Sequence, residues 1–273
     1  NIALEPGASA VLNEIVVVGY GTQRRTAVTG AISSVKAEEL TTVSSSRIDQ
    51  ALQGRTAGVT VLPTSGAPGS GMRIRIRGTG SNQNAEPLYI VDGVRTGGID
   101  NLDPAEVASI EVLKDAASAA IYGSAAANGV VLITTKTGRR NSSEISYNGQ
   151  YGQQSVGRLP DMMNAQQYYQ YLAEAKAPNA PSAADIAAVQ GTGTDWFDAI
   201  FQTAPMMRHS LQFSGGGEKS TYLVNGTYFT QKGIIGDDKA KFDRYTVRIN
   251  TDQKLKDWLS IGERLSYANI SRR

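Results

Sequence analysis

The second half of the chain is built from segments in which apolar and polar residues alternate. Between residues 242 and 252, Tyr245, Val247 and Ile249 fall on one face, while Arg244 and Arg248 fall on the other. Because successive side chains of a β-strand point to opposite faces, this period of two predicts strands with one apolar face. Four more segments follow the same rule, and together they predict an antiparallel sheet: residues 145–151, 211–213, 221–230 and 259–267.

The connections between these strands are alternately short and long. Residues 215–220 and 254–257 form short connections, whereas 157–205 and 232–241 form long ones. Outer-membrane barrels show the same alternation, because their periplasmic turns are short and their external loops are long. The alternation alone also suits a soluble β-sandwich, whose strands likewise have one apolar face.

The long connection contains a helix signal. Asn164 predicts an N-cap for a helix that Pro178 ends.

Composition narrows the function classes. Charged residues make up 19% of the 273 residues, and Tyr outnumbers Phe by 12 to 5, as is typical of Gly- and Tyr-rich antiparallel sheets. A net charge of +2 argues against nucleic acid as a partner. The absence of Cys excludes disulfides and thiol chemistry.

No stretch reaches the roughly 18 apolar residues of a membrane helix, so a chain of this kind crosses a membrane only as a closed barrel. The first residues also lack the pattern of a signal peptide, which indicates a mature or trimmed product.

Catalytic motifs are missing from the sequence. The single histidine, His209, has no Ser or acid at triad spacing, and no Walker lysine follows the Gly-rich loops. The pair Asp237 and Asp238 falls in a predicted loop and is read as solvated. We therefore expect no enzyme, no cofactor and no metal site.

Residues 22–138 form a compact region that is interrupted by many Gly residues and mixes helix-like and strand-like periods. It contains a helix and strand at residues 51–61, a Gly-rich loop with the arginine strand Met-Arg-Ile-Arg-Ile-Arg at 65–78, and Leu-Tyr-Ile-Val-Asp-Gly-Val at 88–94. Asp103-Pro104 predicts the start of a helix. Residues 109–136 then predict a strand, an Ala-rich helix ending at Gly123, an Asn-Gly turn and a buried strand.

In this order, these motifs closely resemble the plug domain of the SusC/RagA family of TonB-dependent outer-membrane transporters. One departure is Ala125, which stands where the family commonly has Arg. The resemblance implies an α+β plug domain followed by antiparallel transmembrane β-barrel strands, of which this chain contains about five. Family barrels have 22 strands, so the remaining strands are expected beyond Arg273.

The domain organisation implied by the resemblance has four parts. Residues 1–13 end an N-terminal extension, 14–22 form a TonB-box segment and linker, 23–138 form the plug, and 139–273 begin the barrel, with a long helical external loop at 157–205.

The implied function is TonB-dependent import of nutrient oligosaccharides across the outer membrane of a Gram-negative bacterium. The implied partners are TonB, a SusD-like surface lipoprotein, an oligosaccharide or peptide substrate and outer-membrane lipid. Peptide import within the same family, a siderophore or cobalamin receptor, and a non-transporting surface-binding β protein remain alternatives.

The TonB-binding segment is expected at Glu14, Ile15, Val16, Val17, Val18 and Gly19. A short β-prone segment of this kind pairs with the exposed edge of a partner sheet, which is how TonB captures the family's TonB box. The alternative is an ordinary edge strand.

Two further sets of residues are candidates for contacts. Arg73, Arg75 and Arg77 share one strand face, and the resemblance implies that they meet acidic residues on the inner barrel wall; a solvated strand face is the alternative. Substrate contacts are expected from polar plug-loop residues, which otherwise form a simple polar turn: Ser81, Asn82, Gln83, Asn84 and Arg95.

Overall fold

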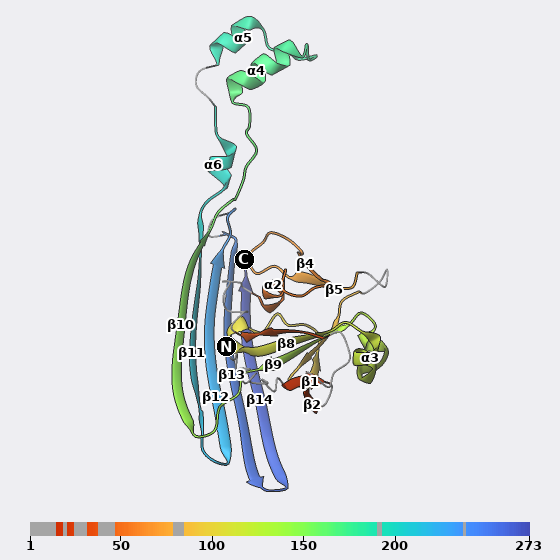
Figure 1. Cartoon of the computed structure of the whole chain (residues 1–273). Helices are drawn as coiled ribbons and strands as arrows, with labels where there is room; N and C mark the ends of the chain where they lie inside the picture. Colours follow the sequence, from red (N-terminus) through yellow and green to blue (C-terminus); the bar gives the residue numbers. More distant parts are fainter. Residues whose placement is uncertain are drawn as a thin grey trace, which may run out of the picture.

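The protein consists of a tall curved sheet and a small mixed domain that lies against one face of it (Figure 1). The computed structural model describes residues 15–18, 21–24, 32–37, 47–78, 85–189, 193–236 and 239–273. The five-stranded sheet is called the wall sheet below, and the domain at residues 32–136 is called the plug domain.

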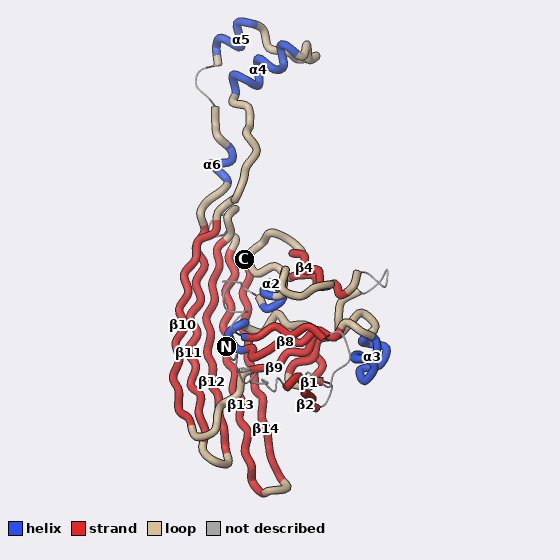
Figure 2. Tube along the Cα trace, in the orientation of Figure 1, coloured by secondary structure: helices blue, strands red, loops and turns tan. Residues whose placement is uncertain are grey.

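The wall sheet contains five long antiparallel strands in sequence order: β10 (Ser142–Gln154), β11 (Ala204–Gly216), β12 (Ser220–Lys232), β13 (Lys241–Lys256) and β14 (Leu259–Arg272). They confirm the strands predicted from the alternation. The short turns lie at one end of the sheet and the long connections at the other (Figure 2). Successive hairpins of this kind need no crossover, since antiparallel neighbours join through a turn.

The two faces of the wall sheet are reversed relative to a soluble sheet. On β13 the polar face is buried against the plug domain, including Arg244, Thr246, Arg248 and Asn250. The apolar face is open, with Tyr245 52% and Val247 44% exposed. A sheet that buries its polar face and exposes its apolar face suits a wall with lipid outside and a polar interior, as in membrane barrels. A soluble sandwich would place the same residues the other way round.

His209 lies on the outward face of the wall sheet, within β11. Its Nδ1 is 2.8 Å from the hydroxyl of Tyr147 on β10. The strand begins five residues earlier, at Ala204, because pairing with β10 continues to Gln154.

The plug domain contains a five-stranded mixed sheet in the order β3-β8-β9-β6-β7. Its strands are β3 (Ile32–Lys36), β6 (Leu88–Val91), β7 (Val94–Thr96), β8 (Val107–Leu113) and β9 (Val130–Thr135). Only β6 and β9 are parallel. β6 and the first four residues of β9 are continuous runs of apolar residues, as is typical of strands covered on both faces, whereas β8 also contains Ser109 and Glu111.

Two apolar clusters cover the faces of the plug sheet. One joins it to the hairpin of β4 (Val59–Pro63) and β5 (Met72–Ile76) and to the short helix α2 (Ile48–Ala51), around Ile74 and Ile110. The other includes Leu113, Leu132 and Ala126. Residues within these clusters are almost completely buried, so the plug domain has a core of its own.

Two predicted helices are shorter than the sequence indicated. The Ala-rich segment forms one α-helical turn, α3 (Ala116–Ala119), and continues as the 3-10 segment η3 (Ala120–Ala126), in which Gly123 has a φ of 66° that interrupts the helix. Asp103 does cap the turn η2 (Pro104–Glu106). That turn stops after three residues because Val107 enters β8.

The connection between β10 and β11 extends beyond the wall sheet and carries α4 (Ala165–Glu174), α5 (Ala183–Ala188) and α6 (Trp196–Ile200) (Figure 1). Asn164 caps α4 as predicted: its side chain accepts from the amide of Gln167, which reciprocates as a capping box. No helix in the described ranges is long and apolar enough to cross a membrane.

Near the N-terminus, β1 (Ile15–Val18) pairs antiparallel with β2 (Gly21–Arg24). The segment expected as a flexible linker through Thr22 therefore contributes to a strand.

Candidate functional site

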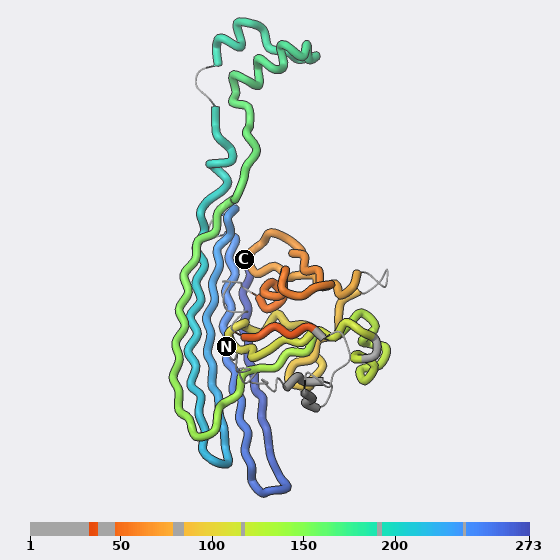
Figure 3. The backbone as a smooth tube through the Cα atoms, in the orientation of Figure 1, coloured from red at the N-terminus to blue at the C-terminus, as the bar shows by residue number. Residues whose placement is uncertain are grey.

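The interface between the plug domain and the inner face of the wall sheet is polar and buried. Figure 3 shows segments far apart in the sequence lying side by side here, with the plug domain against the strands nearest the C-terminus. The contacts join acidic and hydroxyl groups of the plug to arginines and amides of the strands. Because buried charges are costly when unpaired, the pairing at this interface decides whether the plug is held.

The centre of the interface is Asp103, whose side chain is completely buried. Its carboxylate lies 2.5 Å from Nη2 of Arg244 on β13 and 3.5 Å from Nε of Arg208 on β11. Both guanidinium groups lie over the ring of Phe229, at 5.3 and 5.8 Å from its centroid. Two cations thus share one carboxylate and one aromatic face, which compensates part of their desolvation.

Glu106 forms the second ion pair, one turn further along the plug. Its carboxylate accepts from Nε of Arg248 at 2.8 Å and from the hydroxyl of Thr246 at 2.6 Å. Burial raises the pKa of Glu106, and the hydrogen bonds from Thr246 and Arg248 oppose that rise. The η2 turn positions Asp103 and Glu106 on the same side, so that both reach β13.

Amide and hydroxyl contacts extend the interface along β13. Nδ2 of Asn250 donates to the hydroxyl of Thr135 at 2.9 Å and to the carbonyl of Lys136 at 2.7 Å. The same Thr135 donates to Asp92 at 2.7 Å. Asp92 has a φ of 49° in the Asp-Gly turn between β6 and β7 and lies 3.9 Å from Arg248. The turn at Asp92-Gly93 therefore also orients a carboxylate of the interface.

A second charged group lies at the edge of the interface nearest β14. Buried Arg47 binds Asp49 at 2.6 Å and Asp100 at 2.5 Å. The hydrogen bond from Arg47 lowers the pKa of Asp100, and Arg272 on β14 adds to that effect from 3.9 Å. Each cation thus lies next to a carboxylate, so the charges of this group are balanced.

The Gly-rich loop of the plug touches the upper part of the wall sheet. The amide of Gly69 donates to Oε1 of Gln231 on β12 at 3.2 Å, and the amide of Gln231 donates to Gln154 on β10 at 3.0 Å. Gly69 has a φ of 62°, and a Cβ there would overlap the ring of Phe242. Only glycine permits this approach, because the conformation is left-handed and the space is filled.

In the described part of the chain, the arginine strand β5 forms no ion pair with β10–β14. Arg77 instead binds Asp115 of the plug at 2.6 Å. Arg77 also leaves the shared face, because β5 ends at Ile76 and the φ of Arg77 is 57°. In the described interface the charges are opposite to the expectation, with plug acids and wall arginines. A contact of Arg73 and Arg75 with barrel strands stays a prediction.

Most of the other predicted site residues lie outside the described residues: Glu14, Gly19, Ser81, Asn82, Gln83 and Asn84. The loop pair Asp237 and Asp238, which was read as solvated, also lies outside them. Ile15, Val16, Val17 and Val18 form β1, and Arg95 is exposed on the edge strand β7. In the described part of the chain, no group of three or more metal-ligating side chains is placed to hold an ion.

Sequence reasoning missed the interface partners Asp103, Glu106, Arg208, Arg244 and Arg248. Asp103 was read as a helix start, and the two arginines of β13 were read as one polar face. The available signal was two arginines four residues apart on the inward face of a strand, because an isolated inward charge requires a partner.

A family model described as the TonB-dependent Receptor Plug Domain matches residues 24–130. The TonB-dependent receptor P26 of Formosa agariphila is 42% identical over 99% of this chain, and the chain covers 28% of that relative. The TonB-dependent receptor SusC of Bacteroides thetaiotaomicron is 34% identical over 88% of this chain, covering 24% of the relative. The chain thus spans about a quarter of the length of these curated relatives.

Solved structures agree with these relatives. The RagAB peptide importer in its open-open state superposes with a TM-score of 0.85 and 32% identity, over 95% of this chain and 32% of that one. The siderophore receptor PirA of Acinetobacter baumannii has a TM-score of 0.58 at 18% identity over 88% of this chain and 31% of its own, which shows a shared fold alone. Together with the plug-domain match and the buried polar interface, these findings show that the chain belongs to the SusC/RagA family of TonB-dependent receptors, with a plug domain and strands of the transmembrane barrel.

Proposed function

We propose that the protein carrying this chain actively imports nutrient oligomers across the outer membrane of a Gram-negative bacterium, powered by TonB. The observation that carries the proposal is the plug domain seated on the polar inner face of a wall whose outer face is apolar. A plug held by buried ion pairs blocks the barrel interior until TonB pulls on the plug and breaks these contacts. In this proposal, residues 23–138 form the plug and 139–273 the start of the barrel.

TonB is proposed to bind residues 14–19. Support comes from β1, whose extended backbone belongs to a sheet of only two short strands in the described part of the chain. Such a strand has an available edge, and strand addition supplies main-chain hydrogen bonds to a partner. Pulling on this segment transmits force to β3 and the rest of the plug.

The proposed substrate is an oligosaccharide, delivered by a SusD-like surface lipoprotein, with Ser81–Asn84 and Arg95 as plug contacts. A peptide is the second candidate, and one observation favours it: the likeness to the RagAB peptide importer at 32% identity. Import of either substrate uses the same plug and the same TonB-binding segment.

Deletion of Ile15–Val18 tests the proposed coupling. We expect uptake of labelled substrate to fall to the level of a strain without TonB, while binding at the cell surface stays unchanged. Feeding labelled peptides and labelled oligosaccharides in parallel identifies the class that enters. Uptake that survives the deletion would refute the assignment of the TonB-binding segment.

A further inference from the structure

The apolar outward face of the wall sheet is bounded by charged residues in both directions. One row of this face is apolar on all five strands, where the register pairs Ile145, Phe213, Val224, Ile249 and Leu265. The first acids beyond this row are Asp243 towards the long connections and Glu263 towards the short turns. The height between the levels of these two acids is roughly 20 Å at the tilt of barrel strands, close to that of a lipid-facing band.

The β13–β14 hairpin continues beyond the level of Glu263 and projects further than the β11–β12 turn (Figure 2). A β-bulge between Lys254 and Lys256 shifts the register of β13. Lys256 is thereby paired with Leu259, which lies on the same face as Ile261. Because directly paired residues share a face, the bulge turns Lys256 outward, below the apolar band.

An exposed tryptophan lies at the tip of the same hairpin. Trp258 is 77% exposed, and Nζ of Lys256 lies 5.7 Å from the centroid of its ring. Leu255 and Ile261 in the same hairpin are exposed as well. Tryptophan and lysine together are typical of the boundary between hydrocarbon and lipid headgroups, where an apolar ring and a cation both find partners.

The charge of Lys256 has no carboxylate partner in the part of the chain that the structure describes. The nearest acid in sequence, Asp257, instead binds Lys254, whose Nζ lies 2.7 Å from its carboxylate. The ring of Trp258 attracts the lysine but leaves its charge in place. This side of the hairpin therefore presents an uncompensated cation next to an apolar surface.

A second cation comes from the neighbouring β11–β12 turn. The carbonyl of Lys219 accepts the amide of Lys254 at 2.7 Å, so the two turns lie next to each other. Lys219 is exposed and lines a hollow of about 100 Å³ together with Arg140, from the segment before β10. These cations outnumber the single acid of the turn, Glu218, and positive charges gathered at one end of a sheet attract anions.

We propose that the outward side of the β13–β14 hairpin binds an anionic phospholipid of the periplasmic leaflet of the outer membrane. The lipid phosphate pairs with Lys256, Lys219 adds the second positive charge, and the ring of Trp258 lies among the glycerol groups. An anionic headgroup is favoured over a zwitterionic one, because the ammonium group of a zwitterion would be repelled by the same lysines. The inference rests on the proposed function, which places the short turns in the periplasm.

The test uses the full-length protein in nanodiscs of phosphatidylethanolamine with increasing amounts of phosphatidylglycerol. Native mass spectrometry of the released protein gives the mole fraction of phosphatidylglycerol at which half of the protein retains this lipid. The double variant Lys219→Gln, Lys256→Gln should raise that mole fraction at least about tenfold, since each basic residue near an anionic surface contributes a factor of about five. Retention by the parent should also weaken with salt. An unchanged half-saturating mole fraction would overturn the proposal.

The matched control removes the same charge at the other end of the wall sheet. Arg158 and Lys176 are exposed on the long connection between β10 and β11, far from the β13–β14 hairpin (Figure 1). The variant Arg158→Gln, Lys176→Gln should change the half-saturating mole fraction less than twofold. Equal losses in the two double variants would show that net charge alone governs retention. Displacement of the lipid by soluble glycerol 1-phosphate would show a site for free phosphate, and either result would overturn the proposal.

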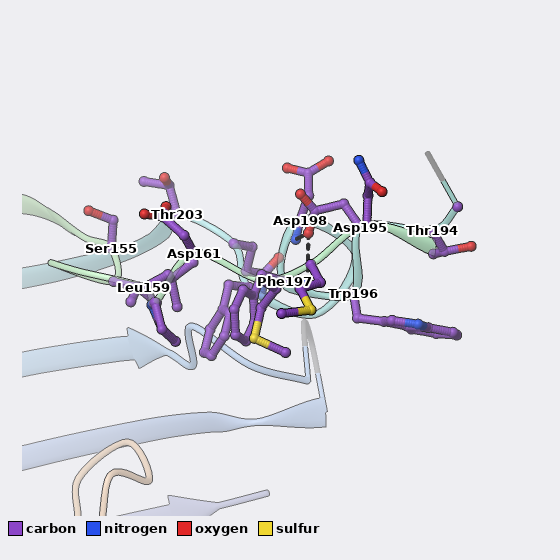
Figure 4. A pocket seen from close by; sticks show the side chains of 17 residues that line it. Ser155, Leu159, Asp161, Thr194, Asp195, Trp196, Phe197, Asp198 and Thr203 are labelled. Carbon is purple, nitrogen blue, oxygen red and sulfur yellow. Dashed lines mark hydrogen bonds between the residues drawn. The ribbon is translucent and has the colours of Figure 1, made fainter. Parts of the chain in front are cut away.

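The two tryptophans of this chain separate the contribution of the ring. Trp258→Ala should weaken retention several-fold and leave its salt dependence intact, because both lysines remain. Trp196 is the control: it is 69% exposed and lines a cavity of about 690 Å³ between the two stems of the β10–β11 connection (Figure 4). Trp196→Ala should leave retention unchanged, and equal effects of the two substitutions would refute the contact with the ring.

The lipid assay needs neither TonB nor an imported substrate. Its failure can therefore be separated from a failure of the proposed function. Retention that does not depend on Lys219 and Lys256, together with uptake that still requires Ile15–Val18, would reject the lipid site and leave the import function standing.

Discussion

At the scale of single residues, a few buried charges hold the plug domain on the wall sheet. Asp103 compensates Arg244 and Arg208, and Glu106 compensates Arg248. Removing one partner of a buried pair is far more damaging than the pair is stabilising, because an uncompensated charge remains in a dry environment.

The variant Asp103→Ala should therefore lower the free energy of opening the plug by about 3–5 kcal/mol. Hydrogen exchange of β8 and β9 amides in the intact protein measures this energy. The exposed pair of Lys254 and Asp257, 2.7 Å apart, provides the control. Asp257→Ala should change the free energy of opening by less than about 0.5 kcal/mol, since an exposed ion pair contributes little to stability. Similar effects of the two variants would contradict the assigned role of burial.

The buried carboxyl group of Glu111 predicts that the stability of the plug domain depends on pH. It is 3% exposed on β8, and its Oε2 has no hydrogen-bond partner among the described residues. Burial raises the pKa of Glu111, opposed by a hydrogen bond with Ser109. Because the folded pKa lies above the unfolded one, the folded plug binds this proton more tightly. Its stability is thus highest below the unfolded pKa and falls as the pH rises towards the folded value.

The variant Glu111→Gln removes this ionisation. We expect it to stabilise β3 and β8 by about 1–2 kcal/mol at pH 8, where the parent carries the cost of a buried charge, and by little at pH 4. The measurement is the difference in hydrogen-exchange protection between variant and parent at each pH. A gain of the same size at both pH values would show that ionisation of Glu111 is not the cause.

At the scale of elements, the Gly-rich loop fastens the plug to the rim of the wall sheet. Gly69 combines a left-handed backbone with direct packing against Phe242 and a hydrogen bond to Gln231. Gly66 in the same loop has open space around it and an ordinary φ. The two glycines therefore form a matched pair for substitution.

Gly69→Ala should detach the loop at a cost of about 2–4 kcal/mol, from backbone strain and overpacking together. Limited proteolysis of the loop between Thr64 and Gly71 should accelerate accordingly. Gly66→Ala should leave the cleavage rate close to that of the parent. Equal rates in the parent and both variants would show that the contact with Phe242 does not hold the loop.

The elements also show where sequence patterns stop being informative. Strands β10–β14 were predictable because apolar residues recur at every second position over many residues. This period identifies a β-strand and shows which side chains share a face of the sheet. The Ala-rich helix was overestimated: Ala favours a helix locally, but α3 ends at Ala119, and Gly123 with a φ of 66° interrupts the 3-10 segment that follows. The pairing of β1 with β2 was missed because a short β-prone segment does not specify its partner.

At the scale of the whole molecule, the outer face of the wall sheet is expected to contact lipid. Leu211 and Gln212 are neighbours near the middle of β11 and point to opposite faces. Leu211→Arg should lower barrel stability in lipid bilayers by about 2–4 kcal/mol, because the charge enters hydrocarbon. Gln212→Arg faces the polar interior and should have a small effect.

Urea unfolding of the full-length protein reconstituted in vesicles measures the difference in stability between Leu211→Arg and Gln212→Arg. A soluble sheet would give the reverse order, with the inward arginine more damaging. The experiment therefore tests the orientation of the whole wall sheet with two adjacent substitutions.

The wall strands, their order, the motifs of the plug and the position of the long connection between β10 and β11 could be predicted from the sequence, since each depends on local periodicity, caps and turns. The sequence did not decide which face of the strands is buried, because an alternating pattern suits a sandwich and a barrel equally. It also did not pair Asp103 and Glu106 with arginines more than 100 residues away. The buried face and the ion pairs both depend on the docking of the plug domain against β13, which brings charges from distant parts of the sequence together. Each charge can be buried there only because its partner is buried beside it.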